Sequence, residues 1–235
     1  MTEVNYSANP GKNLEIQTPY GRFLRIPRKT KLVVDGDDLA QVLSDACGGE
    51  LRDGDMIFMS EKILAISQGR CFDIDDINPR PLAKLLCKFV YKSPYGIGLG
   101  SPWTMELALR DVGTPRILFA AFCSAVTKPF GVRGVFYKVA GERARAIDGP
   151  CDCTIPPYNH AAKMAPAHPD RSARELAGKL GCPVVVMDAN DIGREVLGRS
   201  DESISVDMCK AIFEDNPLGQ NDQQTPCAIV RKLAD

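Results

Sequence analysis

The 235-residue chain lacks the features that indicate a nucleic-acid or membrane role. Its 29 Lys and Arg are balanced by 30 Asp and Glu, so no broad basic field is available to neutralise phosphates. The longest apolar runs, such as 117–126, are about half as long as a bilayer span requires. The polar beginning, residues 1–5, has no signal-peptide pattern. We therefore expect a cytoplasmic protein with neither nucleic acid nor membrane among its partners.

Histidine is scarce and the cysteines are scattered, which argues against a zinc centre or a disulfide framework. The chain has 2 His and 9 Cys, and only Cys151 and Cys153 lie close together in sequence. With His160 and His168 they match no usual zinc spacing, and an odd count without C-x-x-C pairs favours a reducing compartment. Neither histidine accompanies a Ser or Cys nucleophile motif, so a catalytic triad is not indicated.

A standard phosphate-binding loop is also missing. No G-x-x-x-x-G-K-[ST] sequence occurs, and the glycine-rich segment 95–101 lacks the third glycine of G-x-G-x-x-G. The segment leads into a predicted helix with Ser101 as N-cap and Pro102 at its first position, where backbone N–H groups can hold an anion. A tight or flexible turn is the favoured interpretation, with a phosphate cradle as the alternative.

Periodicity and turn residues predict a mixed chain of strands and helices, and thus an α+β or α/β fold with two lobes. The expected strands are 22–34, 56–59, 116–126, 134–140, 183–187 and 227–230. The expected helices are 37–43, 79–89, a helix after Ser101, 170–180 with Ser172 and Glu175 at capping-box separation and Gly181 at its end, and 206–214. The segment after Ser60 stays open between strand and helix. The irregular stretch 148–169 is too long for an ordinary connection and is expected to be a functional loop.

Acidic residues follow apolar segments at several points and are the first candidates for chemistry. Asp188 ends the valine-rich strand, and Asp191 follows three residues later, close enough for both to hold a divalent cation. Capping of the following turn is an equally favoured interpretation. Asp148 also follows a short apolar step, and the loop 219–226 concentrates carboxylate and amide oxygens before the last strand. Each of these segments alone is typical of a surface loop.

Taken in order, these segments resemble the coenzyme F420-0:L-glutamate ligase (gamma-glutamyl ligase) family. The resemblance covers roughly residues 30 to 230, with gaps. The matching segments are 36–40, 51–55, 60–63, 68–70 as the end of a "K-I-x-x-x-x-E-G-R" motif, 146–148 as "A-G-I-D", 165–173 as "L-P-x-D-P-D-x-S-A" and 184–193 as "V-V-x-D-T-x-G". Each motif is short, and the resemblance rests on their order and spacing together.

The resemblance implies a fold, an activity and a set of ligands. Members have an intertwined, two-lobed α+β fold with mixed sheets and flanking helices, form homodimers, and use GTP with Mg²⁺ or Mn²⁺, K⁺ being a further candidate ion. They join L-glutamate to a carboxylate of the deazaflavin precursor F420-0. The implied mechanism transfers a phosphoryl group from GTP to that carboxylate, and the glutamate amine then attacks the acyl phosphate.

The resemblance also implies roles for particular residues. The metal-binding and catalytic aspartates match Asp148 and Asp188, and Asp191 and Asp222 are further metal candidates. The nucleotide-contacting candidates are Ser60, Lys62, Asn159, Gly219, Gln220 and Gln223. For Lys62, a solvated surface lysine is the equally weighted alternative to a phosphate contact.

Several positions depart from the family pattern. Ile66 stands where a second lysine is common, Gln68 replaces a glutamate, and Asp188-Ala189 replaces an Asp-Thr step. The changes predict a divergent branch with another acceptor. Three alternatives to this ligase therefore stay open: a ligase for a different carboxylate, a non-catalytic nucleotide- or deazaflavin-binding protein, and a phosphotransferase that forms no amide.

Overall fold

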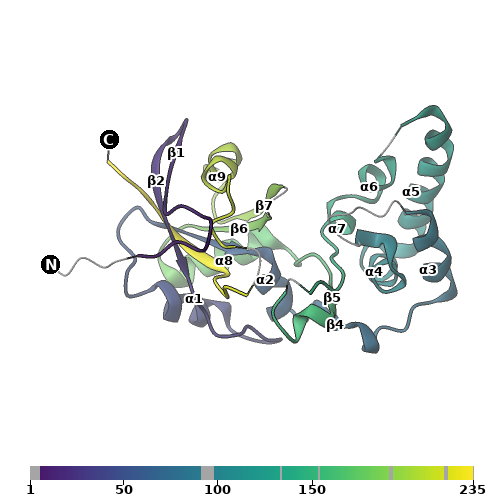
Figure 1. Cartoon of the computed structure of the whole chain (residues 1–235), viewed down its shortest axis with the longest axis horizontal. Helices are drawn as coiled ribbons and strands as arrows, with labels where there is room; N and C mark the ends of the chain where they lie inside the picture. Colours follow the sequence, from purple (N-terminus) through teal and green to yellow (C-terminus); the bar gives the residue numbers. More distant parts are fainter. Residues whose placement is uncertain are drawn as a thin grey trace. The chain divides into compact units, whose positions relative to one another are not determined.

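The computed structural model describes residues 6–90, 98–132, 134–152, 154–190, 193–219 and 222–234. The chain divides into two compact units (Figure 1). Unit 1 consists of Met1–Gln68 and Pro166–Asp235, and unit 2 of Gly69–Ala165. Strands and helices occur in both units, which confirms the α+β expectation with mixed sheet and flanking helices.

Unit 1 is organised around a six-stranded sheet with the order β1-β2-β8-β3-β6-β7. The pair β3 and β6 is parallel, and the other neighbouring pairs are antiparallel. The strands are β1 Glu15–Thr18, β2 Gly21–Arg28, β3 Met56–Ser60, β6 Val184–Ala189, β7 Arg194–Arg199 and β8 Cys227–Lys232. Strands β3, β6 and β8 are almost continuously apolar because both faces of the central sheet are covered.

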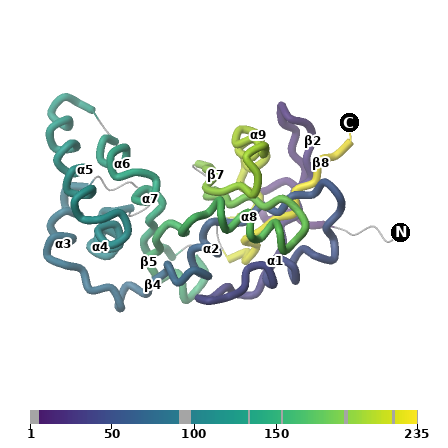
Figure 2. Tube along the Cα trace, turned by 180° about the vertical axis from the view of Figure 1, so that it is seen from behind, coloured from purple at the N-terminus to yellow at the C-terminus, as the bar shows by residue number. Residues whose placement is uncertain are grey.

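Helices cover this sheet, with α9 and α1 on opposite sides of it (Figures 1 and 2). The helices are α1 Leu39–Cys47, α2 Glu61–Ser67, α8 Pro169–Leu180 and α9 Val206–Ile212. Asp38, Ser60 and Ser205 each accept a backbone N–H of the first turn, so α1, α2 and α9 begin at ordinary N-caps. On the α9 side, Phe58 stacks on Phe213 with ring centroids 4.8 Å apart.

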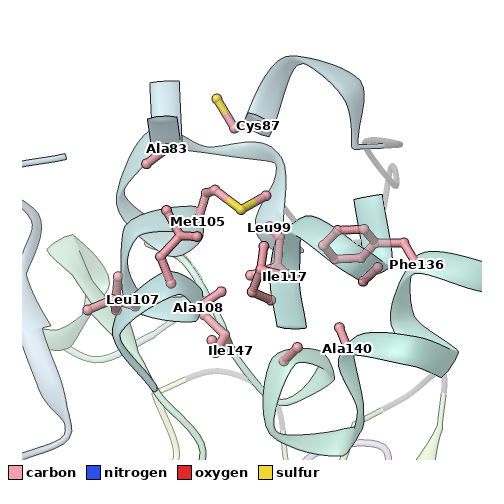
Figure 3. Close-up of a cluster of buried hydrophobic side chains, with 14 of the residues drawn as sticks. Ala83, Cys87, Leu99, Met105, Leu107, Ala108, Ile117, Phe136, Ala140 and Ile147 are labelled. Carbon is pink, nitrogen blue, oxygen red and sulfur yellow. The ribbon is translucent and has the colours of Figure 1, made fainter. Parts of the chain in front are cut away.

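Unit 2 is mainly helical. Its two-stranded sheet pairs β4 Cys71–Asp73 with β5 Ala161–Lys163. The helices are α3 Pro81–Leu86, α4 Pro102–Ala108, α5 Thr114–Thr127, α6 Val135–Ala140 and α7 Glu142–Arg145, with a π-helical turn at Leu109–Gly113 between α4 and α5. Figure 3 shows the core that they enclose, in which Phe136 of α6 points toward Ile117 of α5.

The strands predicted at 116–126 and 134–140 are wrong, because these segments form α5 and α6. The run 117–126 is apolar at almost every position, so it shows no period that would separate a strand from a buried helix. Pro115 in the first turn is the signal that favours a helix. Ile117 and Ala120 are buried three residues apart, which is the spacing of one helix face.

The other predicted elements are present with shifted ends: the strand predicted over 22–34 ends at Arg28. Strands β1 and β7 were not predicted. The open segment after Ser60 is helix α2. Helix α8 begins at Pro169, so Ser172 lies inside it and the predicted capping box is wrong. His168 precedes the helix at φ +47°, and Gly181 ends it at φ +71° as predicted. Within the irregular segment 148–169, the short strand β5 interrupts the predicted loop.

Measured against a bilayer, every helix within the described ranges is too short or too polar to span it.

Candidate functional site

The first candidate segment of unit 1 lies at the end of a central strand. Ser60 is the last residue of β3 and the N-cap of α2, where its Oγ accepts the backbone N–H of Lys62 at 3.2 Å. Both side chains are half-buried. A strand that turns directly into a helix after a single serine fixes Ser60 and Lys62 at the carboxyl edge of the sheet.

Asp188 lies at the same edge on the neighbouring strand. Because β3 and β6 are parallel and Ser60 pairs with Met187, Asp188 is one residue beyond the level of Ser60. Its cross-strand neighbour on β7 is Glu195. Carboxyl ends of adjacent parallel strands commonly form ligand sites in α/β sheets. Asp191 lies outside the described residues.

The loop 219–226 reaches this edge from the other side of β3. Strand β8 runs antiparallel to β3, and its first residue, Cys227, pairs with Met59. The backbone N–H of Ser60 donates to the carbonyl of Pro226 at 2.8 Å. Three segments that the sequence singled out, far apart along the chain, therefore meet at one edge of the sheet of unit 1.

The loop itself is tightly folded at its start. Gly219 has φ +80°, a left-handed conformation that favours glycine, and a Cβ added there would lie 2.7 Å from Oε1 of Gln223 and would require that flexible side chain to shift. Buried Asn216 donates from Nδ2 to the carbonyl of Gly219 at 3.0 Å. The side chain of Asp222 is exposed to solvent. Gln220 lies outside the described residues.

Sequence reasoning missed the residues that hold this loop. Asn9 donates from Nδ2 to the carbonyl of Pro217 and to Oγ1 of Thr225, both at 2.8 Å. Gln224 and Thr30 exchange two hydrogen bonds, of 3.3 and 2.8 Å. No local pattern could reveal these contacts, since they join residues about 200 positions apart.

Glu61, beside Ser60, is a second residue that sequence reasoning did not single out. Its side chain is buried although it lies in the first turn of α2. An acid directly after an N-cap serine is ordinary in sequence, so its burial could not be foreseen. Ile66, on the same helix, is buried as well, and a lysine at this position would place its charge in the core.

Asp148 and Asn159 belong to unit 2. Asp148 and Lys163 exchange backbone hydrogen bonds of 3.0 and 2.9 Å, and Nζ of Lys163 lies 3.5 Å from Oδ2 of Asp148. Lys163 is buried, whereas Asp148 is exposed, so its carboxylate is free to meet solvent or a ligand. Asn159 is half-buried in a 3-10 turn, Tyr158–His160. Asp148 and Asp188 thus lie in different units, and their meeting at one metal stays a prediction.

A different acidic group appears near Asn159. The described residues contain one set of three potential metal ligands within 4.8 Å of one another, formed by Asp73, Asp75 and His160. All three are exposed, and Nε2 of His160 is 3.4 Å from Oδ2 of Asp75, a contact that does not require a metal ion. Cys151 is disulfide-bonded, which removes its thiolate from any zinc set.

Gln68 shows why one departure from the family pattern is stable here. Its amide donates to the carbonyl of Ala167 at 3.0 Å and accepts the N–H of the same residue at 2.7 Å. Only an amide or a protonated acid can do both.

In unit 2, Arg70 binds Asp111, which Arg143 also contacts.

Comparison with known proteins gives a consistent result. Residues 28–135 match the family model described as F420-0:gamma-glutamyl ligase. A curated relative, coenzyme F420:L-glutamate ligase of Methanopyrus kandleri, is 27% identical over 181 residues, which cover 77% of this chain and 62% of the relative. The chain is therefore similar to gamma-glutamyl ligases over these ranges. The range matched by the gamma-glutamyl ligase model contains Ser60 and Lys62 and ends before Asp148.

The sheet edge of unit 1 has the chemistry to bind a phosphorylated ligand. Lys62 supplies a cation that can meet phosphate, while Asp188 and Asp222 supply hard oxygen atoms. Backbone pairing of three adjacent strands fixes Ser60, Asp188 and Cys227 relative to one another. The edge is therefore positioned by the sheet rather than by mobile side-chain contacts.

Proposed function

We propose that the chain is an amide ligase that uses GTP to add L-glutamate to a small carboxylate, with F420-0 as the first acceptor to test. The match to the gamma-glutamyl ligase family and the name of the Methanopyrus relative support this activity. The single structural observation that carries it is the meeting of Ser60, Asp188 and the loop 219–226 at one sheet edge of unit 1. The chain spans 62% of the length of that relative, so the activity of the whole relative is a proposal here.

The proposed reaction has two steps. An oxygen of the acceptor carboxylate attacks the γ-phosphorus of GTP, the bond from that phosphorus to the β-phosphate oxygen breaks, and GDP leaves. The amine of glutamate then attacks the acyl carbon, phosphate leaves, and the amine loses a proton to give the amide. We assign Lys62, Ser60, Asn159, Gly219, Gln220 and Gln223 to nucleotide binding. The Lys62 ammonium would balance phosphate charge in the first step.

The donor atoms at the proposed site fit a hard divalent cation. Asp148, Asp188, Asp191 and Asp222 offer carboxylate oxygens, which suit Mg²⁺ or Mn²⁺ better than a thiophilic metal. We propose that these four residues hold such an ion, with Asp148 and Asp188 as the catalytic pair and K⁺ as a further candidate ion. When bound, a divalent cation supplies charge stabilisation for phosphoryl transfer.

The decisive experiment follows product mass. Purified protein is mixed with L-glutamate, F420-0, GTP or ATP, and Mg²⁺ or Mn²⁺, and the acceptor is expected to gain one glutamate residue as GDP and phosphate appear. Asp188→Asn is expected to abolish this gain. Its matched control is Glu195→Gln, because Glu195 is the cross-strand neighbour of Asp188 and forms an ion pair with Lys210.

The other outcomes distinguish the alternatives. Nucleotide binding without turnover on any carboxylate contradicts the ligase and favours a binding protein. Phosphate transfer without amide formation favours a phosphotransferase. Amide formation with another carboxylate, but not with F420-0, confirms a ligase and corrects its acceptor.

We also propose that the protein forms a homodimer, and helix α5 suggests the surface. Leu118, Phe119, Phe122 and Val126 are exposed and lie within about 100° of the helix circumference, opposite the buried Ile117. A helix that is apolar on both sides is normally buried on both.

The area of this surface is consistent with self-association. Phe119, Phe122 and the following Phe130 are 60%, 64% and 81% exposed. At roughly 200 Å² per phenylalanine, they expose about 400 Å², half of the ~800 Å² that each partner of a standard interface buries. Light scattering is expected to give twice the chain mass, and Phe122→Asp to give a folded monomer. A wild-type monomer would contradict the dimer.

A further inference from the structure

Two buried thiols of unit 1 lie close enough to react with each other. Cys47 ends α1 and Cys227 begins β8, and their sulfur atoms are 3.9 Å apart, although 180 residues separate them in sequence. Both side chains are free thiols and are almost completely buried. A disulfide needs sulfurs about 2.05 Å apart, a difference of less than 2 Å that side-chain rotation and a small shift of the helix end can supply.

We propose that Cys47 and Cys227 form an oxidisable dithiol, which a peroxide converts to a disulfide that joins the end of α1 to the start of β8. One sulfur attacks the peroxide, forming a sulfenic acid and releasing water. The other sulfur attacks the first, the S–S bond forms, and a second water leaves. For hydrogen peroxide, two thiols thus give one disulfide and two waters, and two electrons pass to the peroxide.

The surroundings of the pair favour Cys47 as the attacking sulfur. The hydrogen bond from Cys227 lowers the pKa of Cys47 despite its burial, and the charge of Arg28 contributes to the lowering. The same interaction and burial raise the pKa of Cys227. Arg28 is held over the end of α1, since its Nε donates to the carbonyl of Ala46 at 2.8 Å and its guanidinium lies 2.7 Å from Glu50.

Burial makes the thiols of two further cysteines in unit 1 harder to ionise than that of Cys47. Burial raises the pKa of Cys182 to about 11, and the charges of Cys47 and Asp55 contribute. A thiol with this pKa is almost entirely protonated near neutral pH, so it is a poorer first attacker of a peroxide than Cys47. Cys209, buried in the same unit, also has its pKa raised to about 11 by burial. The two residues therefore serve as internal references for selective oxidation.

The disulfide would act on the candidate site because Cys227 follows the loop 219–226 directly. Pro226 accepts the N–H of Ser60, so the bond would fix α1, the end of this loop and the start of α2 to one another. Oxidation would also close a chain loop of about 180 residues, which restricts the unfolded state strongly. The oxidised protein is expected to melt about 5–10 °C higher than the reduced protein.

The test oxidises the reduced full-length protein with hydrogen peroxide, then unfolds it, alkylates free thiols and maps peptides by mass spectrometry. The expected product is a peptide pair linked through Cys47 and Cys227, lighter by two hydrogen atoms and reversed by dithiothreitol. The higher melting temperature should accompany it. Cys209→Ala is expected to leave both results unchanged, whereas Cys47→Ala removes both.

Three results would overturn the proposal. Cys47 and Cys227 could stay fully alkylated when the more exposed Cys71 and Cys123 are oxidised, because the buried pair never opens to peroxide. Cys47 could link to Cys182 instead. The linked pair could form without any rise in melting temperature, which would show that the bond does not constrain α1 and β8 as proposed. The peptide map of the linked pair is measured on the wild-type protein, so misfolding of a variant does not affect the conclusion.

Discussion

The two units hold their chains together in different ways. Unit 1 is built on a six-stranded sheet. One of its buried clusters contains a single alanine, Ala228, among larger side chains that include phenylalanine, valine, methionine and isoleucine. Unit 2 packs short helices on a two-stranded ladder, and six of the sixteen buried members of its cluster are alanines. Small side chains let short helices approach closely, whereas large ones fill the space between a sheet and its helices.

This difference determines where each unit can place a functional group. In unit 1, strand pairing fixes Ser60, Asp188 and Cys227 side by side, so a site at the sheet edge is rigid. In unit 2, Asp148 is held by an isolated bridge to Lys163, outside the regular strands. We therefore expect the functional side chains at the sheet edge of unit 1 to move less than Asp148 in unit 2.

The largest expected effect is on activity. Asp188→Asn and Asp148→Asn should each lower kcat for amide formation by about 100-fold or more, because each removes a charge proposed to act during phosphoryl transfer. Circular dichroism should show both variants folded. Glu195→Gln, the exposed neighbour of Asp188, should stay within about twofold of wild type. If Asp148→Asn alone is active, the site belongs to unit 1 entirely.

The next largest effect is on the stability of unit 1. The fully buried Arg25 binds Asp215 and donates to the carbonyls of Ile212, at 2.9 Å, and Asn13, at 2.6 Å. Asp215→Ala leaves the guanidinium buried without its counter-ion, which should lower the free energy of unfolding by about 3–5 kcal/mol. Urea unfolding measures this loss. Glu15→Gln, in an exposed ion pair with Arg22, should change stability by less than about 1 kcal/mol.

The same pair predicts a pH dependence. Burial alone would raise the pKa of Asp215, but hydrogen bonding and the charge of Arg25, with the N–H of Asn13, lower it overall. A carboxyl group with a lowered native pKa stabilises the fold above its unfolded pKa, about 3.9, and this contribution is lost as pH falls through the native pKa. Asp215→Ala should therefore flatten the acid limb of the stability curve. An unchanged acid limb would contradict the assignment.

Sequence patterns predicted unit 1 better than unit 2 for a physical reason. In unit 1, cap residues such as Asp38 and turn residues such as Gly181 separate apolar runs of strand length from amphipathic helices. In unit 2, residues 117–126 are apolar on both sides of the helix, so the period that marks a helix is missing. Because the exposed face of this helix carries Phe119 and Phe122 instead of polar residues, the sequence shows no helical period.

The sequence predicted the segments that form the candidate site, but not the residues that hold those segments in place. Ser60, Asp188 and the loop 219–226 carry recognisable motifs, and strand pairing brings them together. Asn9 and the buried Glu61 have no local signal, since their roles depend on residues distant in sequence or on burial. Long-range packing is the information that a single sequence lacks.

A smaller effect tests the helix in unit 2. Ile117→Ala should cost about 2–4 kcal/mol of unfolding free energy because the side chain is completely buried. In a strand, Phe119 would share the face of Ile117, and Phe119→Ala would cost as much. In the helix, Phe119 is 60% exposed, so this variant should cost under about 1 kcal/mol, apart from any loss of a dimer contact. Urea unfolding at low protein concentration separates the two cases. Equal losses of unfolding free energy in Ile117→Ala and Phe119→Ala would contradict the helix and favour a strand.

The smallest expected effect concerns Gln68, where unit 1 departs from the family pattern. Gln68→Glu keeps the acceptor for the N–H of Ala167 but replaces the donor to its carbonyl with a carboxylate oxygen. The resulting repulsion should lower the free energy of unfolding by about 1–2 kcal/mol at neutral pH. Gln17→Glu on the exposed face of β1 should change it by less than about 0.5 kcal/mol.

The pH dependence of this variant separates the lost donor from a change in packing. A glutamic acid regains a donor when it is protonated, so the deficit of Gln68→Glu relative to wild type should shrink as the pH falls toward about 4. A deficit independent of pH would mean that the volume or shape of the side chain, and not its hydrogen bond, matters. If the deficit does shrink at low pH, a glutamate at this position needs a protonated state or a different partner, and Gln68 is the residue that holds Ala167 at neutral pH.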